Sequence, residues 1–216
     1  MIATARLEHF AVATFAADRA VVAALLPEGV EVDLPLVSAV AYRYVGLGLR
    51  GLPAPRLSAA QVHLRAYVRV GDEQGVWFLR TVQDSRWATL PHHLWGMPWV
   101  RGAVAMSEPS AGRVVVAAQG IDLQVDRAPA GATTPDVPAE VSAATIGWFH
   151  GRGGVRRFEV AYGDGRVQPA CAPTARVVPF ESLGLVGPTD APQSAFLRPS
   201  TAIEIHLPPT EAARAR

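Results

Sequence analysis

The sequence predicts a mainly β protein of the α+β class, folded as one domain over residues 1–216 around a closed or nearly closed sheet. Roughly nine segments are rich in Val, Tyr and Trp or alternate apolar with polar residues, which is typical of strands. Helical patterns are few and short. The chain has 216 residues, half of them hydrophobic, and is long enough to bury a core that encloses a small-molecule cavity.

The first part of the chain contains one short helix and a series of strands. Asp18 precedes an apolar pattern over residues 19–26 that a proline and a glycine end, so a helix of about two turns is expected there. Gly71 separates two strand-like runs and favours a hairpin between them. The strands expected in this part cover residues 38–49, 61–70 and 75–83.

The second part of the chain is also rich in strands. Residues 86–96 lack strand alternation and predict a short helix or turn, and residues 128–138 contain three prolines and predict a loop. The strands expected here cover residues 99–106, 113–118, 121–127, 155–162, 166–178 and 195–207.

Three glycines, Gly46, Gly48 and Gly51, have the spacing of a dinucleotide-binding fingerprint and follow an expected strand. That motif needs a helix N-terminus to hold the pyrophosphate. Pro53 and Pro55 follow instead and prevent a helix at this point. The glycines are therefore interpreted as bends in a curved strand.

Charge and composition favour a small-molecule ligand. The formal net charge of +1 gives no field strong enough to attract nucleic acid or an acidic membrane. Residues 1–10 carry Arg6, Glu8 and His9 and no long apolar stretch, so neither a signal peptide nor a membrane span is expected. We expect a cytoplasmic protein that binds a small neutral or weakly anionic molecule. The sequence leaves the oligomeric state open, a homo-oligomer included.

All twenty basic residues are arginines, and the chain contains no lysine. A GC-rich genome accounts for this composition, but its chemical consequence remains. Without a lysine, imine formation at a side-chain amine is excluded. Cys171 is the single cysteine, so no internal disulfide can form, and a small buried side chain is its expected role.

Motifs of hydrolases and metal enzymes do not occur. The sequence has no Gly-x-Ser-x-Gly, no His-Glu-x-x-His and no Cys/His pair at metal-ligand spacing. The side chains of His92 and His93 diverge because the residues are adjacent. No metal site and no cofactor are expected.

The most informative segment is residues 61–68. A period of two places four polar or aromatic residues on one strand face and apolar residues on the other. The four are Gln61, His63, Arg65 and Tyr67. On an open antiparallel sheet this face would be in water, whereas in a closed sheet it could line an internal binding site. Tyr42 and Tyr44, also two residues apart, could extend the same wall.

Several stretches resemble an uncharacterised bacterial branch, the YqjF-like or DUF2071 proteins, of the acetoacetate-decarboxylase-like superfamily. They are Leu25-Leu-Pro-Glu-Gly-Val-Glu-Val-Asp33, residues 61–68, Gly75-Val-Trp-Phe-Leu79 and Leu94-Trp-Gly-Met-Pro98, continuing to Met106. The resemblance covers residues 20–106 in order, with weaker similarity to the end. It implies a bent, cone-shaped closed β-sheet with an internal cavity and a few short helices.

The resemblance also implies which decarboxylase residues are lost. Where those enzymes have Pro-Lys-Lys, this chain has Pro98-Trp99-Val100, so both amines are absent. A cavity glutamate falls at Gln61, and the carboxylate that precedes Pro-Lys-Lys falls at His93. Arg65 matches an arginine of the YqjF-like strand and is retained.

The expected function is a cofactor-independent enzyme of small-molecule or secondary metabolism, and not a Schiff-base decarboxylase. The candidate reactions are a cyclisation, dehydration, isomerisation or lyase step on a carbonyl compound. Arg65 would stabilise oxyanion charge, and His93 or His63 would be the general acid or base. The residues expected to bind substrate are Tyr42, Tyr44, Gln61, Tyr67 and Trp99. The alternative is a non-catalytic protein that binds a hydrophobic metabolite.

Overall fold

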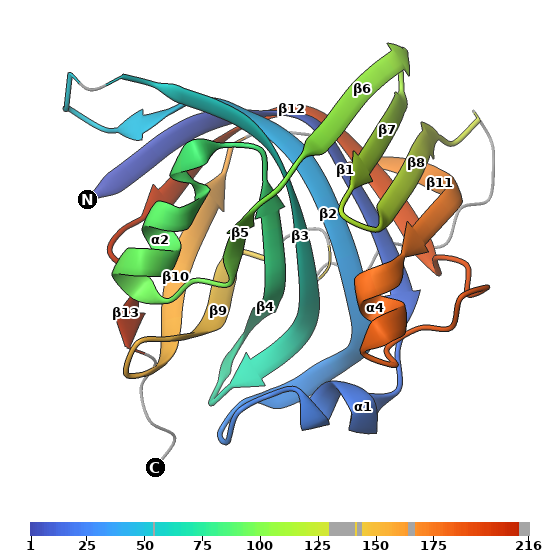
Figure 1. Ribbon diagram of the computed structural model, residues 1–216, viewed down its shortest axis with the longest axis horizontal. Coiled ribbons are helices and arrows are strands. Elements are labelled where there is room, and N and C mark those ends of the chain that lie inside the picture. The colour runs from blue at the N-terminus through green and yellow to red at the C-terminus, as the bar shows by residue number, and fades with distance from the viewer. Residues whose placement is uncertain (54, 130–140, 142–143, 164–166, 212–216) are drawn as a thin grey trace.

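The computed structural model describes residues 1–53, 55–129, 141, 144–163 and 167–211. Most of them lie in one strongly bent sheet, with a few short helices against it (Figure 1). The strands are β1 (Ile2–Ala16), β2 (Glu31–Leu49), β3 (Leu57–Val70), β4 (Glu73–Gln83), β5 (Trp99–Arg101), β6 (Val104–Ser110), β7 (Arg113–Ala118), β8 (Ile121–Arg127), β9 (Ile146–Gly151), β10 (Gly154–Tyr162), β11 (Gln168–Val177), β12 (Ser194–His206) and β13 (Thr210–Glu211). The helical segments are α1 (Arg19–Ala24), the 3-10 turn η1 (Arg86–Ala88), α2 (Thr89–Trp95) and α4 (Val178–Ser182). The mainly β fold class is confirmed.

The sheet returns on itself through one additional strand pairing. Its strands follow the order β13-β10-β9-β4-β3-β2-β1-β12-β11-β8-β7-β6, with β5 beside β4. An antiparallel pairing also joins β10 to β12, where Val160 faces Ile205. Because β10 and β12 are the two ends of the run β10-β9-β4-β3-β2-β1-β12, this pairing closes seven strands into a ring.

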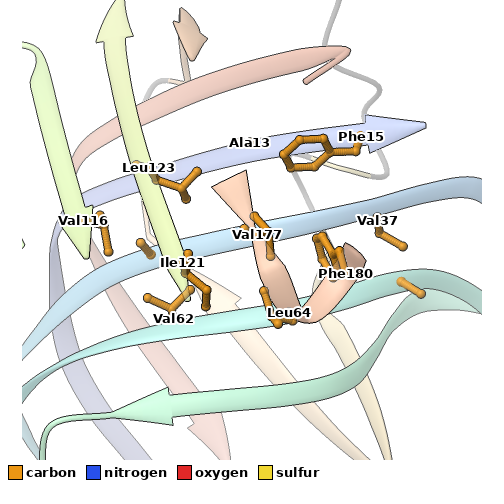
Figure 2. Close-up of a cluster of buried hydrophobic side chains, with 14 of the residues drawn as sticks. Ala13, Phe15, Val37, Val62, Leu64, Val116, Ile121, Leu123, Val177 and Phe180 are labelled. Carbon is orange, nitrogen blue, oxygen red and sulfur yellow. The ribbon is translucent and has the colours of Figure 1, made fainter. Parts of the chain in front are cut away.

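Two apolar cores lie on opposite faces of the strands β1 to β3. On one face, side chains of these strands pack against β7, β8 and α4, with Leu64, Ile121 and Phe180 at the centre (Figure 2). Burying a side chain such as Phe180 stabilises the fold by about 1.5–3 kcal/mol. The other face turns to the inside of the ring, where Leu7, Val12 and other apolar residues gather. Strand β3 is therefore covered on both faces.

Most expected elements are observed near their expected bounds. The helix after Asp18 forms, and the Asp18 side chain accepts hydrogen bonds from the backbone N–H groups of Ala20 and Val21. Strands β3 and β4 form the expected hairpin. Gly46 has a φ of 71° at the register irregularity between Tyr44 and Leu47, which agrees with a bend in a curved strand. Of the loop expected at residues 128–138, residues 130–138 lie outside the described part of the chain.

Other elements differ from the expectation. Strand β1 was not expected, because the polar run at Glu8 and His9 interrupts its alternation, and this run coincides with a β-bulge. Strand β9 was not expected either, since two of its six residues are glycines. Cys171 is exposed and not buried: it lies in β11, and its Sγ reaches only the carbonyl oxygen of Asp126. In the described residues, no helix is long and apolar enough to span a membrane.

The ring depends on a close approach between β4 and β9. These strands run parallel, with Val76 beside Gly147 and Trp77 beside Trp148. A Cβ atom on Gly75 would lie 2.3 Å from the carbonyl oxygen of Ile146 and 2.6 Å from the Trp148 ring. Only glycine allows the two backbones to come this close.

We predict that Gly75→Ala destabilises the protein, although alanine is ordinarily better than glycine in a strand. The added methyl group must displace backbone atoms of β9, which costs about 1–3 kcal/mol. Gly48→Ala is the matched control, because its Cβ would meet only a flexible Arg56 side chain at 3.5 Å. Urea unfolding measures both variants. An unchanged or raised stability in Gly75→Ala would contradict the close β4–β9 junction.

Candidate active site

The polar face of β3 is buried inside the ring of strands. Gln61, His63 and Arg65 are only 3%, 6% and 5% exposed. Their neighbours on the opposite face, such as Val62 and Leu64, are buried as well. The face is thus not the solvated side of an open sheet. Buried polar groups of this kind must find partners within the protein.

His63 is the centre of a first group of hydrogen bonds. Its Nδ1 lies 2.7 Å from Oγ1 of Thr81 on β4, and its Nε2 lies 2.7 Å from the phenol oxygen of Tyr42 on β2. The Gln61 amide nitrogen lies 2.9 Å from the same Nε2 and also donates to the Tyr42 oxygen. The ring of Phe78 meets the imidazole edge-on at 4.9 Å. Both imidazole nitrogens are therefore occupied.

Arg65 belongs to a second group on the same face. Its Nη2 donates to the phenol oxygen of Tyr67 at 3.2 Å and to the carbonyl oxygen of Val141 at 3.1 Å. The Tyr67 oxygen lies 2.5 Å from Oγ of Ser38, which in turn lies 3.0 Å from Oγ1 of Thr14. Three hydroxyl groups from β1, β2 and β3 thus form a continuous chain that ends at the guanidinium.

Several buried polar atoms of this region have no hydrogen-bond partner in the part of the chain that the structure describes. They include Nε of Arg65, the Gln61 carbonyl oxygen and the Gln83 carbonyl oxygen. The Gln83 amide nitrogen donates to Tyr44, but its oxygen is left over. Among the residues that the structure describes, no carboxylate forms an ion pair with Arg65. An anionic or carbonyl-bearing ligand could supply the acceptor that Arg65 Nε requires.

The electrostatics keep this site uncharged apart from arginine. Burial, and secondarily the positive charge of Arg65, lowers the pKa of His63 to about 3. Burial also raises the pKa of Tyr44 to about 12 and that of Tyr42 above its usual range. At neutral pH the imidazole and the phenols are therefore neutral hydrogen-bonding groups. Tyr42, Tyr44, Tyr67 and Tyr162 all join the core cluster inside the ring, and they are all the tyrosines of the chain.

The structure brings most of the expected site residues together, places Trp99 beside them and leaves His93 apart. His93 is exposed on α2, and its ring neighbour is His92. Trp99 on β5 pairs beside Thr81, and its side chain packs with Met97, Phe149 and Phe158 in a small core that shares Phe78 with the core inside the ring. The Trp99 Nε1 atom is buried, and no described residue is its hydrogen-bond partner. Roles for His93 and Trp99 in a common site stay predictions.

Other members of the site were not expected from the sequence. Thr81 and Gln83 are two residues apart on the strand that pairs with β3, so the register of the hairpin could have indicated them. Ser38 and Thr14 carried no such signal, because their strands meet only in the fold. Arg198 on β12 was also missed, and its guanidinium lies 5.0 Å above the centre of the Tyr162 ring.

The lowered pKa of His63 predicts a specific pH dependence of stability. In the unfolded chain the imidazole of His63 has a pKa of about 6.5. Between that pH and about pH 3, unfolded molecules therefore bind a proton at His63 and folded molecules do not. Stability then falls as the pH falls through this window, by at most about 1.4 kcal/mol per pH unit. His63→Gln should remove this contribution, and His93→Gln, an exposed histidine, should not.

Urea unfolding at pH 7 and pH 5 measures the effect. The unmodified protein should lose about 2 kcal/mol more than His63→Gln between these two pH values. The same loss in both proteins would show that His63 is not held neutral in the folded state.

Comparison with known proteins places the fold and the family. The family model of DUF2071, described as an uncharacterized conserved protein, matches residues 4–202. Among proteins of curated function, none has a sequence that matches the chain.

Solved structures of acetoacetate-decarboxylase-like enzymes share the fold. MppR, an enduracididine biosynthesis enzyme complexed with pyruvate, has a TM-score of 0.72 at 14% identity, covering 95% of this chain and 88% of MppR. An acetoacetate decarboxylase-like enzyme from Sphingomonas wittichii RW1 has a TM-score of 0.70 at 16% identity, with 94% and 90% covered. Acetoacetate decarboxylase from Legionella pneumophila has a TM-score of 0.64 at 11% identity, with 92% and 84% covered. The match to residues 4–202 and the shared fold show that this chain belongs to the DUF2071 family and has the acetoacetate-decarboxylase-like fold.

Proposed function

We propose that this protein is an enzyme of small-molecule metabolism that acts on a small carbonyl compound with a carboxylate, such as a 2-oxo acid. It works without a cofactor and without a covalent imine. Arg65 stabilises negative charge on the substrate in a cyclisation, dehydration, isomerisation or lyase step. The observation that carries this proposal is the buried guanidinium of Arg65, whose Nε has no hydrogen-bond partner among the described residues.

The hydrogen bonds around Arg65 support a role in ligand binding. Its Nη2 is already fixed by Tyr67 and Val141, so the plane of the guanidinium is set before a ligand arrives. The hydroxyl chain through Ser38 and Thr14 fixes Tyr67 in turn. A donor held in this way stabilises a developing oxyanion without having to reorganise during the reaction.

The neutral groups beside Arg65 support enolate chemistry. Tyr42 can donate from a phenol that stays protonated, and His63 offers a neutral imidazole. An anionic ligand at Arg65 would offset that cation's part in holding down the pKa of His63. In this scheme the substrate displaces the Tyr42 hydroxyl and the Gln61 amide from Nε2 of His63, which then accepts the C–H proton and later returns it, while Arg65 holds the enolate oxygen.

The absence of lysine restricts the comparison with the structural neighbours. MppR has been solved with pyruvate and with the condensation product of pyruvate and imidazole 4-carboxaldehyde. A small 2-oxo acid is therefore a reasonable first ligand for this chain too. Because the chain has no lysine, any such ligand must be activated by hydrogen bonds and charge.

A second candidate function is the storage or sequestration of a metabolite without catalysis. The low pKa of His63 and the raised pKa values of Tyr42 and Tyr44 favour it. None of these groups changes its charge near neutrality in the ligand-free protein, and general acid–base catalysis works best with a pKa close to the working pH.

We predict that Arg65→Gln abolishes enzyme-dependent exchange of the methyl protons of pyruvate in D₂O. Loss of one charge-stabilising donor typically slows a reaction by about 10²–10³. Arg69→Gln is the matched control, since Arg69 lies on the same strand and pairs with Asp33 at 2.8 Å outside the site. Proton NMR of pyruvate follows the exchange, and thermal unfolding verifies that both variants are folded.

The two candidate functions give different results in this experiment. Exchange that depends on Arg65 and not on Arg69 supports the enzyme. Pyruvate binding without any exchange supports the storage protein. Equal exchange in Arg65→Gln and the unmodified protein would remove Arg65 from the mechanism.

A further inference from the structure

Thr81 contacts His63 on the side of the imidazole that is opposite to Tyr42 and Gln61. The two residues face each other in the antiparallel pair of β3 and β4, and Oγ1 of Thr81 lies 2.7 Å from Nδ1 of His63. Thr81 is completely buried. The hydroxyl of Thr81 is therefore the group that holds Nδ1 inside the ring of strands.

The segment that follows α2 keeps Thr81 in place. The backbone N–H of Thr81 donates to the carbonyl oxygen of Pro98 at 2.8 Å, and β5 runs parallel to β4 here, with Trp99 beside Thr81. The branched Cβ of threonine also restricts its side-chain rotamers. The direction of the hydroxyl is therefore set by the sheet and not by a ligand.

The partners of His63 indicate which of its nitrogens carries the hydrogen. The imidazole is neutral at pH 7, because its pKa is lowered to about 3, so only one nitrogen is protonated. The neighbours of Nε2 are the Gln61 amide nitrogen at 2.9 Å, which can only donate, and the Tyr42 hydroxyl at 2.7 Å. Nε2 must therefore accept. The hydrogen then lies on Nδ1, which donates it to Oγ1 of Thr81.

This arrangement leaves the lone pair on the nitrogen that the proposed substrate would meet. A substrate that displaces Tyr42 and Gln61 from Nε2 leaves the bond between Nδ1 and Thr81 in place. The ring of Phe78, edge-on at 4.9 Å, restricts rotation of the imidazole. When Nε2 takes the C–H proton, the electron pair of that bond stays on the substrate as the enolate. Both nitrogens then carry hydrogen, and Thr81 still accepts from Nδ1.

We propose that Thr81 is a positioning residue that holds His63 in the Nδ1–H tautomer, with the lone pair of Nε2 directed at the substrate. This inference rests on the proposed function, in which His63 takes the C–H proton. Without the Thr81 hydroxyl, the hydrogen on Nδ1 would be buried without an acceptor. The Gln61 carbonyl oxygen, which has no partner among the described residues, can then turn to accept from Nε2–H instead. That tautomer has no base at Nε2.

NMR of the ¹⁵N-labelled protein at pH 7 tests the tautomer directly, because the chemical shifts of Nδ1 and Nε2 differ between the two neutral forms. We expect the hydrogen on Nδ1 in the unmodified protein and in Thr81→Ser, which keeps the hydroxyl. Thr81→Val has nearly the same shape without the hydroxyl, so it should shift the population toward Nε2–H. Thr201→Val is the matched control, since the buried Thr201 hydroxyl donates to the carbonyl oxygen of Gly163 and does not contact His63.

Proton exchange of pyruvate in D₂O gives the second measurement. Thr81→Val should exchange about two- to tenfold more slowly, the range expected for the loss of one neutral hydrogen bond. Its Kd for pyruvate should not change, since Arg65 still binds the anion. Thr81→Ser should restore most of the rate, and Thr201→Val should exchange like the unmodified protein. Thermal unfolding verifies that each variant is folded.

The results also distinguish this inference from the proposed function. A hydrogen on Nε2 in the unmodified protein would overturn the role of Thr81 without the need for any variant, and so would an unchanged tautomer in folded Thr81→Val. In both cases, pyruvate exchange that depends on Arg65 would leave the proposed function standing. A tautomer that changes in Thr81→Val, in a protein that never exchanges pyruvate, would support the role of Thr81 and refute the enzyme.

Discussion

Both faces of strand β3 are buried, and this burial determines how the polar residues of the site are partnered. Val62 and Leu64 pack against the layer formed by β7, β8 and α4 (Figure 2). Gln61, His63 and Arg65 point the other way and are enclosed by the ring of seven strands. A polar face in this position carries a desolvation cost that only internal partners or a ligand can offset. The hydrogen-bonded groups at His63 and Arg65 offset much of it, and Nε of Arg65, which has no partner within the described residues, marks where a ligand would complete it.

Burial also determines which chemistry these residues can perform. In water the His63 imidazole would titrate near neutrality, but inside the ring its pKa falls to about 3. The phenols change in the opposite direction, because burial disfavours the charged form of each group. Arginine alone keeps its charge, since its guanidinium is the most basic and least strongly hydrated of the cations. The result is a site of fixed donors around one cation, which suits the binding and stabilisation of negative charge.

The period of two in residues 61–68 was enough to identify the polar face of β3 and its four members from the sequence. The same rule applied to the expected hairpin would have added Thr81 and Gln83. It could not identify Thr14 or Arg198, because their strands join the site through long-range pairing, nor Ser38, because the register of β2 against β3 shifts at irregularities before Val37. Strand β1 was missed because of the bulge at His9. His9 has a positive φ, and the residues at this bulge break the alternation that marks a strand. For His93 the resemblance to the decarboxylases implied a position in the cavity. The structure has this residue exposed on α2, so matching residues by sequence alone did not give its place in the fold.

The chemistry proposed for this site depends on Arg65 binding a small organic anion without a covalent bond. A crystal structure of the protein soaked in pyruvate tests it most directly. We expect pyruvate inside the ring, with an oxygen at hydrogen-bonding distance from Arg65 Nε and no covalent bond to any protein atom. Pyruvate bound elsewhere while Arg65 Nε keeps no new partner, or pyruvate joined covalently to the protein, would contradict it.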